Sequence, residues 1–243
     1  MRIQIALVSA LALSACQTGQ PTAWVAPDVA GPPDLSTCDV VPRERWAELN
    51  SGEDIAVPAQ FADIVTADPS LAAVSTLSGS ILCVDNSYVG AMNDMEWLAG
   101  ERFLGWQWFG YEAFGYFVAD RQDAGSIMDV GARPHFSPSG AKMASLQISD
   151  AGWGGMEGFA VWQVTPAGID PLSMQVSVGD TQHPQVFLDN FGQWSFAGWH
   201  GEDCIDLSVD PYETSPPDPR GTAPRKFFAQ QDNDWEIAEG ECS

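Results

Sequence analysis

The stretch RPHFSPSGAKMASLQIS, residues 133–149, carries the clearest local structural signal in the chain. At its centre, Ser137-Pro138-Ser139-Gly140 has proline at the second position and glycine at the fourth, which is the pattern of a type I β-turn. Phe136 ends an apolar segment before the turn, and residues 142–148 form an apolar segment after it. The stretch therefore predicts an antiparallel β-hairpin.

The same pattern continues along the chain. A glycine-rich segment, residues 153–158, leads into FAVWQV at 159–164, an apolar run typical of a buried strand. Thr165-Pro166-Ala167-Gly168 repeats the turn chemistry, and residues 169–178 then form the return strand. Successive strands joined by tight turns indicate a β-meander.

This combination of an aromatic residue, a Ser-Pro-Ser-Gly turn and a following Trp-containing strand resembles the blades of WD40-like and Tol-type β-propellers. The resemblance covers residues 116–178, and Ser139 stands where those families usually have Asp. It implies a β-propeller-like fold built from antiparallel meanders.

Weaker copies of the turn occur elsewhere. Asp189-Asn190-Phe191-Gly192 precedes QWSFAG, and Gly79 precedes SILCV. Gly79, Gly140 and Gly192 are 61 and 52 residues apart, whereas regular propeller blades repeat every ~40–45 residues. We therefore expect residues 37–243 to form one irregular, propeller-like all-β domain of about four or five sheets, with a β-sandwich as the alternative. Closing the propeller would hide most strand edges.

The first residues have the features of a lipoprotein leader. Arg2 precedes an apolar segment, residues 3–13, that is short for a membrane span, and Leu13-Ser14-Ala15-Cys16 follows. These residues resemble the lipobox of bacterial lipoproteins, which implies removal of residues 1–15 and lipidation of Cys16. The alternative is an ordinary secretory signal with a chance cysteine.

Residues 16–36 are rich in proline, glycine and small polar residues, so we expect a flexible tether. Gln17, rather than Asp, after the cysteine favours the outer membrane in enteric bacteria. The expected location is therefore the outer membrane, with the domain held by its lipid anchor and facing the periplasm or the cell surface.

Four further cysteines, Cys38, Cys83, Cys204 and Cys242, are an even number in a chain expected to be exported, which favours two disulfides. Three connectivities are possible. We favour Cys38–Cys83 and Cys204–Cys242, because pairing neighbours in sequence would fasten each end of the domain.

The chain is strongly acidic, with 33 Asp and Glu against 10 Lys and Arg, a formal charge of −23. Such a surface disfavours nucleic acid and direct adhesion to anionic lipid. It is compatible with a cationic protein partner, although solubility alone is the commoner reason for such a charge.

Aromatic residues concentrate in the segment 97–117. Exposed on one face of a strand, such rings would bind sugars or apolar peptides; buried, they would be core. Glu101 and Glu112 flank the run, so a glycan- or peptidoglycan-acting hydrolase with paired carboxylates is one alternative function. The candidate binding residues are Trp106, Trp108, Tyr111, Glu112 and Tyr116.

No sequence motif indicates a catalytic residue, a metal or a cofactor. His135, His183 and His200 have no paired metal-ligand spacing, and no G-x-S-x-G or phosphate-binding G-x-x-x-x-G-K-[ST] segment occurs. DNDWE, residues 232–236, alternates acids but lacks the glycine of a calcium loop. We therefore expect a non-enzymatic protein that binds a ligand or an envelope protein or takes part in envelope assembly. The alternatives are the hydrolase and an acidic binder of cationic proteins.

Overall fold

The structure is a computed structural model that describes residues 31–38, 55–86, 89, 91–110, 113–147, 158–173, 192–212, 223–231 and 235–243. Cys16, most of the tether, Tyr111, Glu112 and His183 lie outside these residues. Within the described part, helix is confined to two single-turn 3-10 segments, η1 (Leu35–Thr37) and η2 (Ala59–Phe61). Across the same part, no helix is long and apolar enough to cross a bilayer.

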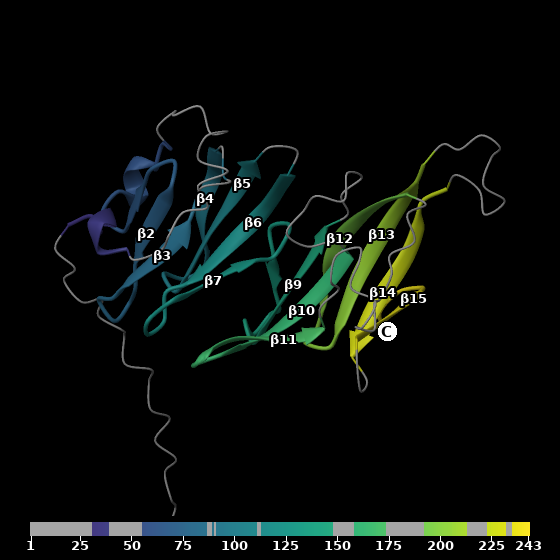
Figure 1. The fold of residues 1–243 in the computed structure, drawn as a ribbon. Coiled ribbons are helices and arrows are strands. Elements are labelled where there is room, and N and C mark those ends of the chain that lie inside the picture. The colour runs from purple at the N-terminus through teal and green to yellow at the C-terminus, as the bar shows by residue number, and fades with distance from the viewer. Residues whose placement is uncertain are drawn as a thin grey trace, which may run out of the picture.

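Fifteen described strands form four antiparallel sheets, each a meander of strands consecutive in sequence (Figure 1). The all-β prediction of about four sheets is confirmed. The first sheet contains β1 (Val65–Ala67), β2 (Leu71–Ser75) and β3 (Ile81–Asp85), and the second contains β4 (Ala91–Ala99), β5 (Phe103–Gly110), β6 (Ala113–Asp120) and β7 (Ser126–Asp129). The third contains β8 (His135–Phe136), β9 (Lys142–Gln147), β10 (Gly158–Thr165) and β11 (Gly168–Ser173), and the fourth contains β12 (Gly192–His200), β13 (Cys204–Pro211), β14 (Arg225–Gln231) and β15 (Trp235–Glu239).

The hairpin at residues 133–149 is the first hairpin of the third sheet. Gly140 N donates to Ser137 O at 2.8 Å, which closes the expected four-residue turn. Gly140 has φ +72°, a conformation that favours glycine, and the Ser137 hydroxyl accepts from Lys142 N at 3.1 Å. The turn is therefore fixed by its own local chemistry.

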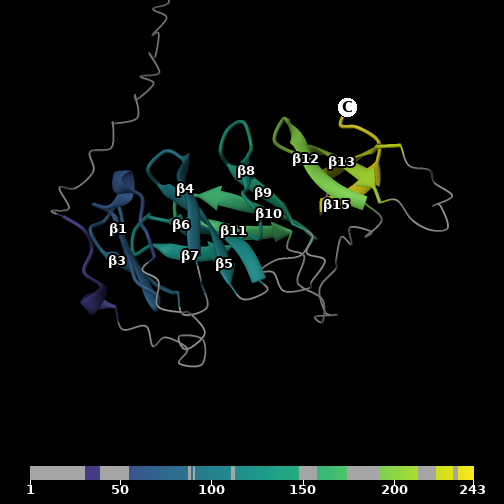
Figure 2. The ribbon, with the colours of Figure 1, turned by 90° about the horizontal axis from the view of Figure 1, so that it is seen from above.

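The four sheets pack face to face in sequence order. One apolar cluster lies between the first and second sheets, a second between the second and third, and a third between the third and fourth. No cluster among the described residues joins the first sheet to the fourth, and the two lie at opposite ends of the array (Figures 1 and 2). The propeller-like sheets therefore form an open array and do not close into a ring.

The three marker glycines occupy different places in their sheets, which explains their uneven spacing. Gly79 lies in the last turn of the first sheet, Gly140 in the first turn of the third, and Gly192 begins β12. The distances between them therefore do not measure the repeat from one sheet to the next.

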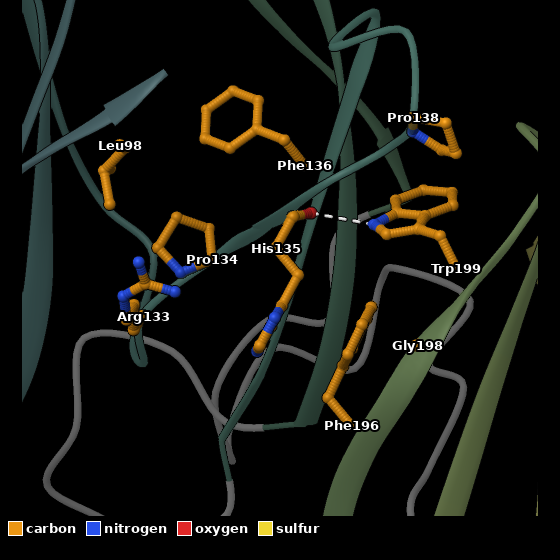
Figure 3. A pocket seen from close by; sticks show the side chains of 9 residues that line it. All are labelled: Leu98, Arg133, Pro134, His135, Phe136, Pro138, Phe196, Gly198 and Trp199. Carbon is orange, nitrogen blue, oxygen red and sulfur yellow. Dashed lines mark hydrogen bonds between the residues drawn. The ribbon is translucent and has the colours of Figure 1, made fainter. Parts of the chain in front are cut away.

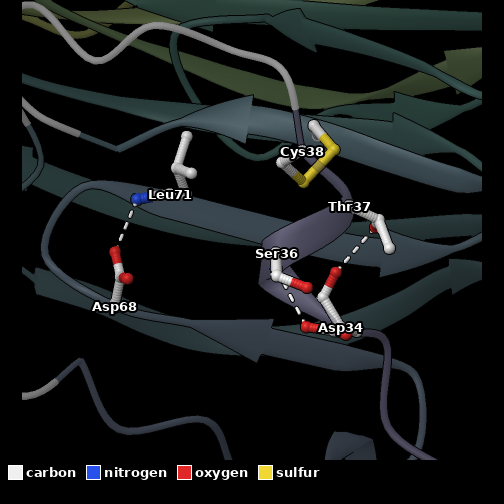
Figure 4. Close-up of a disulfide and its surroundings, with 7 residues drawn as sticks. Asp34, Ser36, Thr37, Cys38, Asp68 and Leu71 are labelled. Carbon is white, nitrogen blue, oxygen red and sulfur yellow. Dashed lines mark hydrogen bonds between the residues drawn. A yellow bond between two sulfur atoms is a disulfide. The ribbon is translucent and has the colours of Figure 1, made fainter.

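Each end sheet of an open array has one face without a neighbouring sheet, and a disulfide lies on each of these faces. Leu82 packs toward the second sheet and Val84 is buried, so Cys83 between them points to the outer face. The Cys38–Cys83 bond holds η1 against that face, and Asp34 caps η1 by accepting from Ser36 N at 2.9 Å (Figure 4). The predicted pairing at this end is confirmed.

The fourth sheet has the corresponding arrangement. Ile205 and Leu207 face its core, so Cys204 and Asp206 point outward by alternation. The Cys204–Cys242 bond returns the C-terminal residues to this face, where Cys242 N donates to Asp206 Oδ1 at 2.9 Å. The second predicted pairing is also confirmed, and both disulfides fasten chain segments at the ends of the array.

Removing either disulfide is expected to destabilise the domain, because each bond restricts the unfolded chain. The bonds join cysteines 45 and 38 residues apart. For loops of this length, Cys38→Ala with Cys83→Ala should lower the free energy of unfolding by about 2–4 kcal/mol, and Cys204→Ala with Cys242→Ala by a similar amount. Urea denaturation without reductant measures the change. Unchanged midpoints in both double variants would contradict the structure.

Candidate functional site

The predicted binding rings Trp106 and Trp108 lie in the core between the first and second sheets. They are 0% and 4% exposed, and both pack on Phe117 with ring centroids 5.6 and 5.7 Å apart. Their burial matches the second interpretation of the aromatic run, that such rings form core. These two indoles therefore offer no platform to a ligand.

The Trp108 indole is further fixed by a polar contact. Its Nε1 donates to Asp129 Oδ2 at 3.0 Å, and burial raises the pKa of this carboxyl although the hydrogen bonds from Gly131 N and Trp108 oppose the shift. Gly115 permits the contact, because a Cβ atom there would approach Trp108 Nε1 to 2.5 Å. The Trp108–Asp129 contact therefore explains why glycine stands at position 115 within the aromatic run.

Tyr116 points to the other face of the second sheet. Its ring is buried with the cluster between the second and third sheets, and its hydroxyl donates to Glu96 Oε1 at 3.0 Å. Burial, followed by the Glu96 carboxylate, raises the pKa of the Tyr116 phenol, so it remains a donor at neutral pH. Glu101 is exposed at the β4–β5 turn, and Glu112 lies outside the described residues.

A groove of about 360 Å³ opens where three sheets meet, and we call it the aromatic groove (Figure 3). The first strand of each of these sheets contributes to its wall: β4 through Leu98, β8 through His135 and Phe136, and β12 through Phe196, Gly198 and Trp199. Arg133, Pro134 and Pro138 complete the lining. First strands are edge strands of their sheets, so the groove lies along three sheet edges.

Two contacts hold the third and fourth sheets together across the groove. The His135 ring stacks on Phe196 with centroids 4.1 Å apart and planes 3° apart, and Trp199 Nε1 donates to His135 O at 2.9 Å (Figure 3). Trp199 also packs edge-on against Trp235 of the core. The walls of the groove are therefore preformed.

The turns beyond the groove reinforce this junction. Ser139 N donates to Glu202 Oε1 at 2.8 Å, and Lys142 Nζ donates to Asp203 Oδ1 at 2.5 Å and to Glu202 O at 3.0 Å. The turn of residues 137–140 is thus tied to the turn that joins β12 and β13.

An ion pair marks the other end of the groove. Arg133 donates to Glu96 through Nε at 2.5 Å and Nη2 at 2.8 Å, and this fork lowers the pKa of the Glu96 carboxyl. Glu96 also accepts from Tyr116, so β4, β6 and the segment before β8 meet in one network. The charge of Arg133 is therefore already neutralised within the protein.

A second hollow of about 180 Å³ also has Arg133 in its lining. Its exposed lining is mostly apolar, and we call it the polar cavity after the charged and amide side chains around it. The side chains that line it come from β4, β5, β6 and the segment before β8: Asp94, Glu96, Gln107, Phe114, Tyr116 and Arg133. Phe114 is 37% exposed, and its cross-strand partner Phe109 is 39% exposed. Thus two of the exposed aromatic rings of the run, Phe109 and Phe114, lie near its polar network.

The structure gives the surroundings of two of the three histidines, His135 and His200. The His135 imidazole makes no side-chain hydrogen bond to a carboxylate or hydroxyl within the described residues, and its stacking partner is Phe196. His200, Asp206 and Cys242 lie close together, but Cys242 is in a disulfide and has no thiolate to offer a metal. Asp232 and Asp234 of the acidic DNDWE segment lie outside the described residues.

Sequence reasoning did not identify Arg133, His135, Phe196 and Trp199 as a site. Arg133 and His135 lie in the stretch that predicts the hairpin, on either side of Pro134, and Trp199 lies in β12, which begins at Gly192. The residues that form the groove are far apart in the chain, and only sheet packing brings them together.

Comparison of the chain with protein-family models, curated proteins and solved structures finds no match.

The His135 environment predicts a pH-dependent stability. Burial, followed by the nearby positive charge of Arg133, lowers the pKa of His135 below 6.5 in the folded protein. The unfolded chain therefore binds the proton more readily, and the free energy of unfolding should fall as the pH drops below about 6.5. Urea denaturation between about pH 7 and pH 5.5 should show this loss for the native chain.

His135→Phe is the matched variant, because it keeps an aromatic ring against Phe196 and removes the titration. Its free energy of unfolding should fall less over the same pH range. An equal loss in both proteins would show that other groups cause the pH dependence.

Proposed function

We propose that the protein is a lipid-anchored, non-enzymatic binding protein of the bacterial envelope, attached to the outer membrane through Cys16. The leader and tether support the anchor, and the two disulfides fit an oxidising compartment. The observation that carries the binding role is the aromatic groove, a preformed concave surface in which prolines and aromatic rings lie beside the polar groups of Arg133 and His135.

The chemistry of the groove favours an extended protein segment as its ligand. Prolines and aromatic rings line it, and such grooves bind extended peptides by packing against their side chains. The edge strand β12 adds backbone groups that pair only with β13 on their other side. A peptide therefore finds both apolar contact and backbone partners here.

The charge of the protein favours a basic segment. Acids outnumber bases 33 to 10, and the one guanidinium at the groove, that of Arg133, is held by Glu96. An acidic partner would be repelled by the whole surface, whereas a basic one would be attracted over a distance set by the ionic strength. The ligand we propose is a basic, extended segment of another envelope protein.

Photo-crosslinking in intact cells tests this proposal. A crosslinking amino acid at Pro138, which is exposed and lines the groove, should capture one defined protein, and the crosslinked peptide should be net basic. The same residue at Pro166, in the equivalent turn between β10 and β11 but outside the groove, is the control and should capture none. Equal capture at both positions, or none at Pro138, would overturn the proposal.

Salt distinguishes docking in the groove from charge capture alone. Binding of the captured segment to the purified protein should weaken at 0.5 M salt (about a 4 Å Debye length) but persist, because contact with the apolar walls is not screened. Complete loss at high salt would favour the alternative of an acidic binder of cationic proteins.

The lipid anchor has its own test. Labelled palmitate should appear on the native chain and not on Cys16→Ser, and the variant should be released from the membrane fraction. Label on neither chain would indicate that residues 1–15 act as an ordinary secretory signal.

A further inference from the structure

A backbone distortion in β4 lies at the polar cavity. The β4–β5 pairing shifts register between Asn93 and Glu96, and Asp94 in this bulge has φ +52°, in the left-handed region. Non-glycine residues adopt this conformation at a cost, and such bulges often redirect side chains toward a binding site. Here Met95 packs in the core and Asp94 lines the polar cavity.

Glu96, Arg133 and Tyr116 hold one another in place at the cavity, and other polar atoms there can still form hydrogen bonds with a ligand. Glu96 is fixed by two bonds from Arg133 and one from Tyr116, yet Arg133 Nη1 makes no hydrogen bond within the described residues. The same holds for the side chains of Asp94 and Gln107, which both line the cavity. The exposed lining of the cavity is mostly apolar, and the carboxylate acceptors, the amide and the guanidinium donor add a small polar part to it.

An aromatic ring stands beside these groups. Phe114 lines the cavity and remains 37% exposed, and the facing Phe109 extends the apolar surface. A flat apolar ring next to a set of donors and acceptors fits a ligand with one apolar face and a rim of hydroxyls. A sugar ring has this shape and chemistry.

We propose that the polar cavity binds an uncharged sugar residue, which stacks on Phe114 and uses its hydroxyls to bond Asp94, Gln107 and Arg133. The volume of about 180 Å³ suits a single ring and is too small for a folded partner. The carboxylates of Asp94 and Glu96 outnumber the single guanidinium of Arg133, and the chain carries a charge of −23, so acidic sugars are excluded by repulsion. The sugar site is separate from the aromatic groove, with Arg133 between them.

Titration of the lipid-free, disulfide-bonded protein with glucose, mannose, N-acetylglucosamine and glucuronic acid tests the assignment. Ligand-observed NMR should detect at least one uncharged sugar and no binding of glucuronic acid. Phe114→Ala and Gln107→Leu should each weaken the bound sugar about three- to tenfold, because one removes the stacking surface and the other the amide.

Two further variants separate binding from stability. Phe114→Trp keeps a stacking ring and should bind at least as tightly as the native chain, whereas Tyr212→Ala, which removes an exposed ring of the fourth sheet, should bind unchanged. Cooperative urea unfolding of every variant establishes that it is folded. Crosslinking from Pro138 should be unaffected by Phe114→Ala, so failure of one site is distinguishable from failure of the other.

Several results would overturn the proposal. Binding of no uncharged sugar is one, and equal affinity in Phe114→Ala and the native chain is another. Binding of glucuronic acid as tightly as glucose would contradict the charge argument. Binding of lysine methyl ester in place of the sugars would assign the cavity to cationic ligands.

Discussion

Every sheet in this protein has two faces that must each be covered or polar, and this constraint shapes the whole molecule. The two middle sheets are covered on both faces by their neighbours. Because the array is open, no neighbouring sheet among the described residues covers the outer faces of the first and fourth sheets. On the outer face of the first sheet lies η1, held there by the Cys38–Cys83 disulfide. The outer face of the fourth sheet carries Asp206, Ser208 and the Cys204–Cys242 disulfide. The disulfides therefore substitute, at the two ends, for the contacts that ring closure would supply.

Opening the array also creates the surface on which the proposed function rests. In each of the last three sheets the first strand is an edge strand, and these edges converge beside residues 133–138. Aromatic and proline side chains occupy the space between these edges. The hydrogen bond from Trp199 Nε1 to His135 O holds the third and fourth sheets together there. Arg133 lies between this groove and the polar cavity, so its pairing with Glu96 affects the shape of both hollows.

The aromatic run illustrates what a strand pattern leaves open. Successive side chains of a strand point in opposite directions, so Trp106 and Trp108 share one face of β5. The β5–β6 register places Tyr116 on the other face. Whether a face is core or ligand platform depends on the sheet packed against it. Trp106 and Trp108 are covered by the first sheet, while Phe109 and Phe114 lie beyond the reach of the third.

The features that could be predicted from the amino acids alone are those that local chemistry controls. Proline and glycine predicted the Ser137–Gly140 turn, and short turns between apolar strands predicted that strands neighbouring in sequence pair in each sheet. The even number of cysteines indicated two disulfides, and the favoured pairing is confirmed. Three features depend on tertiary packing and could not be predicted from the sequence. The array stays open, Leu98, His135 and Trp199 meet in one groove, and Arg133 pairs with Glu96. These contacts join residues on different sheets, and they depend on how whole sheet faces pack, which no short segment encodes.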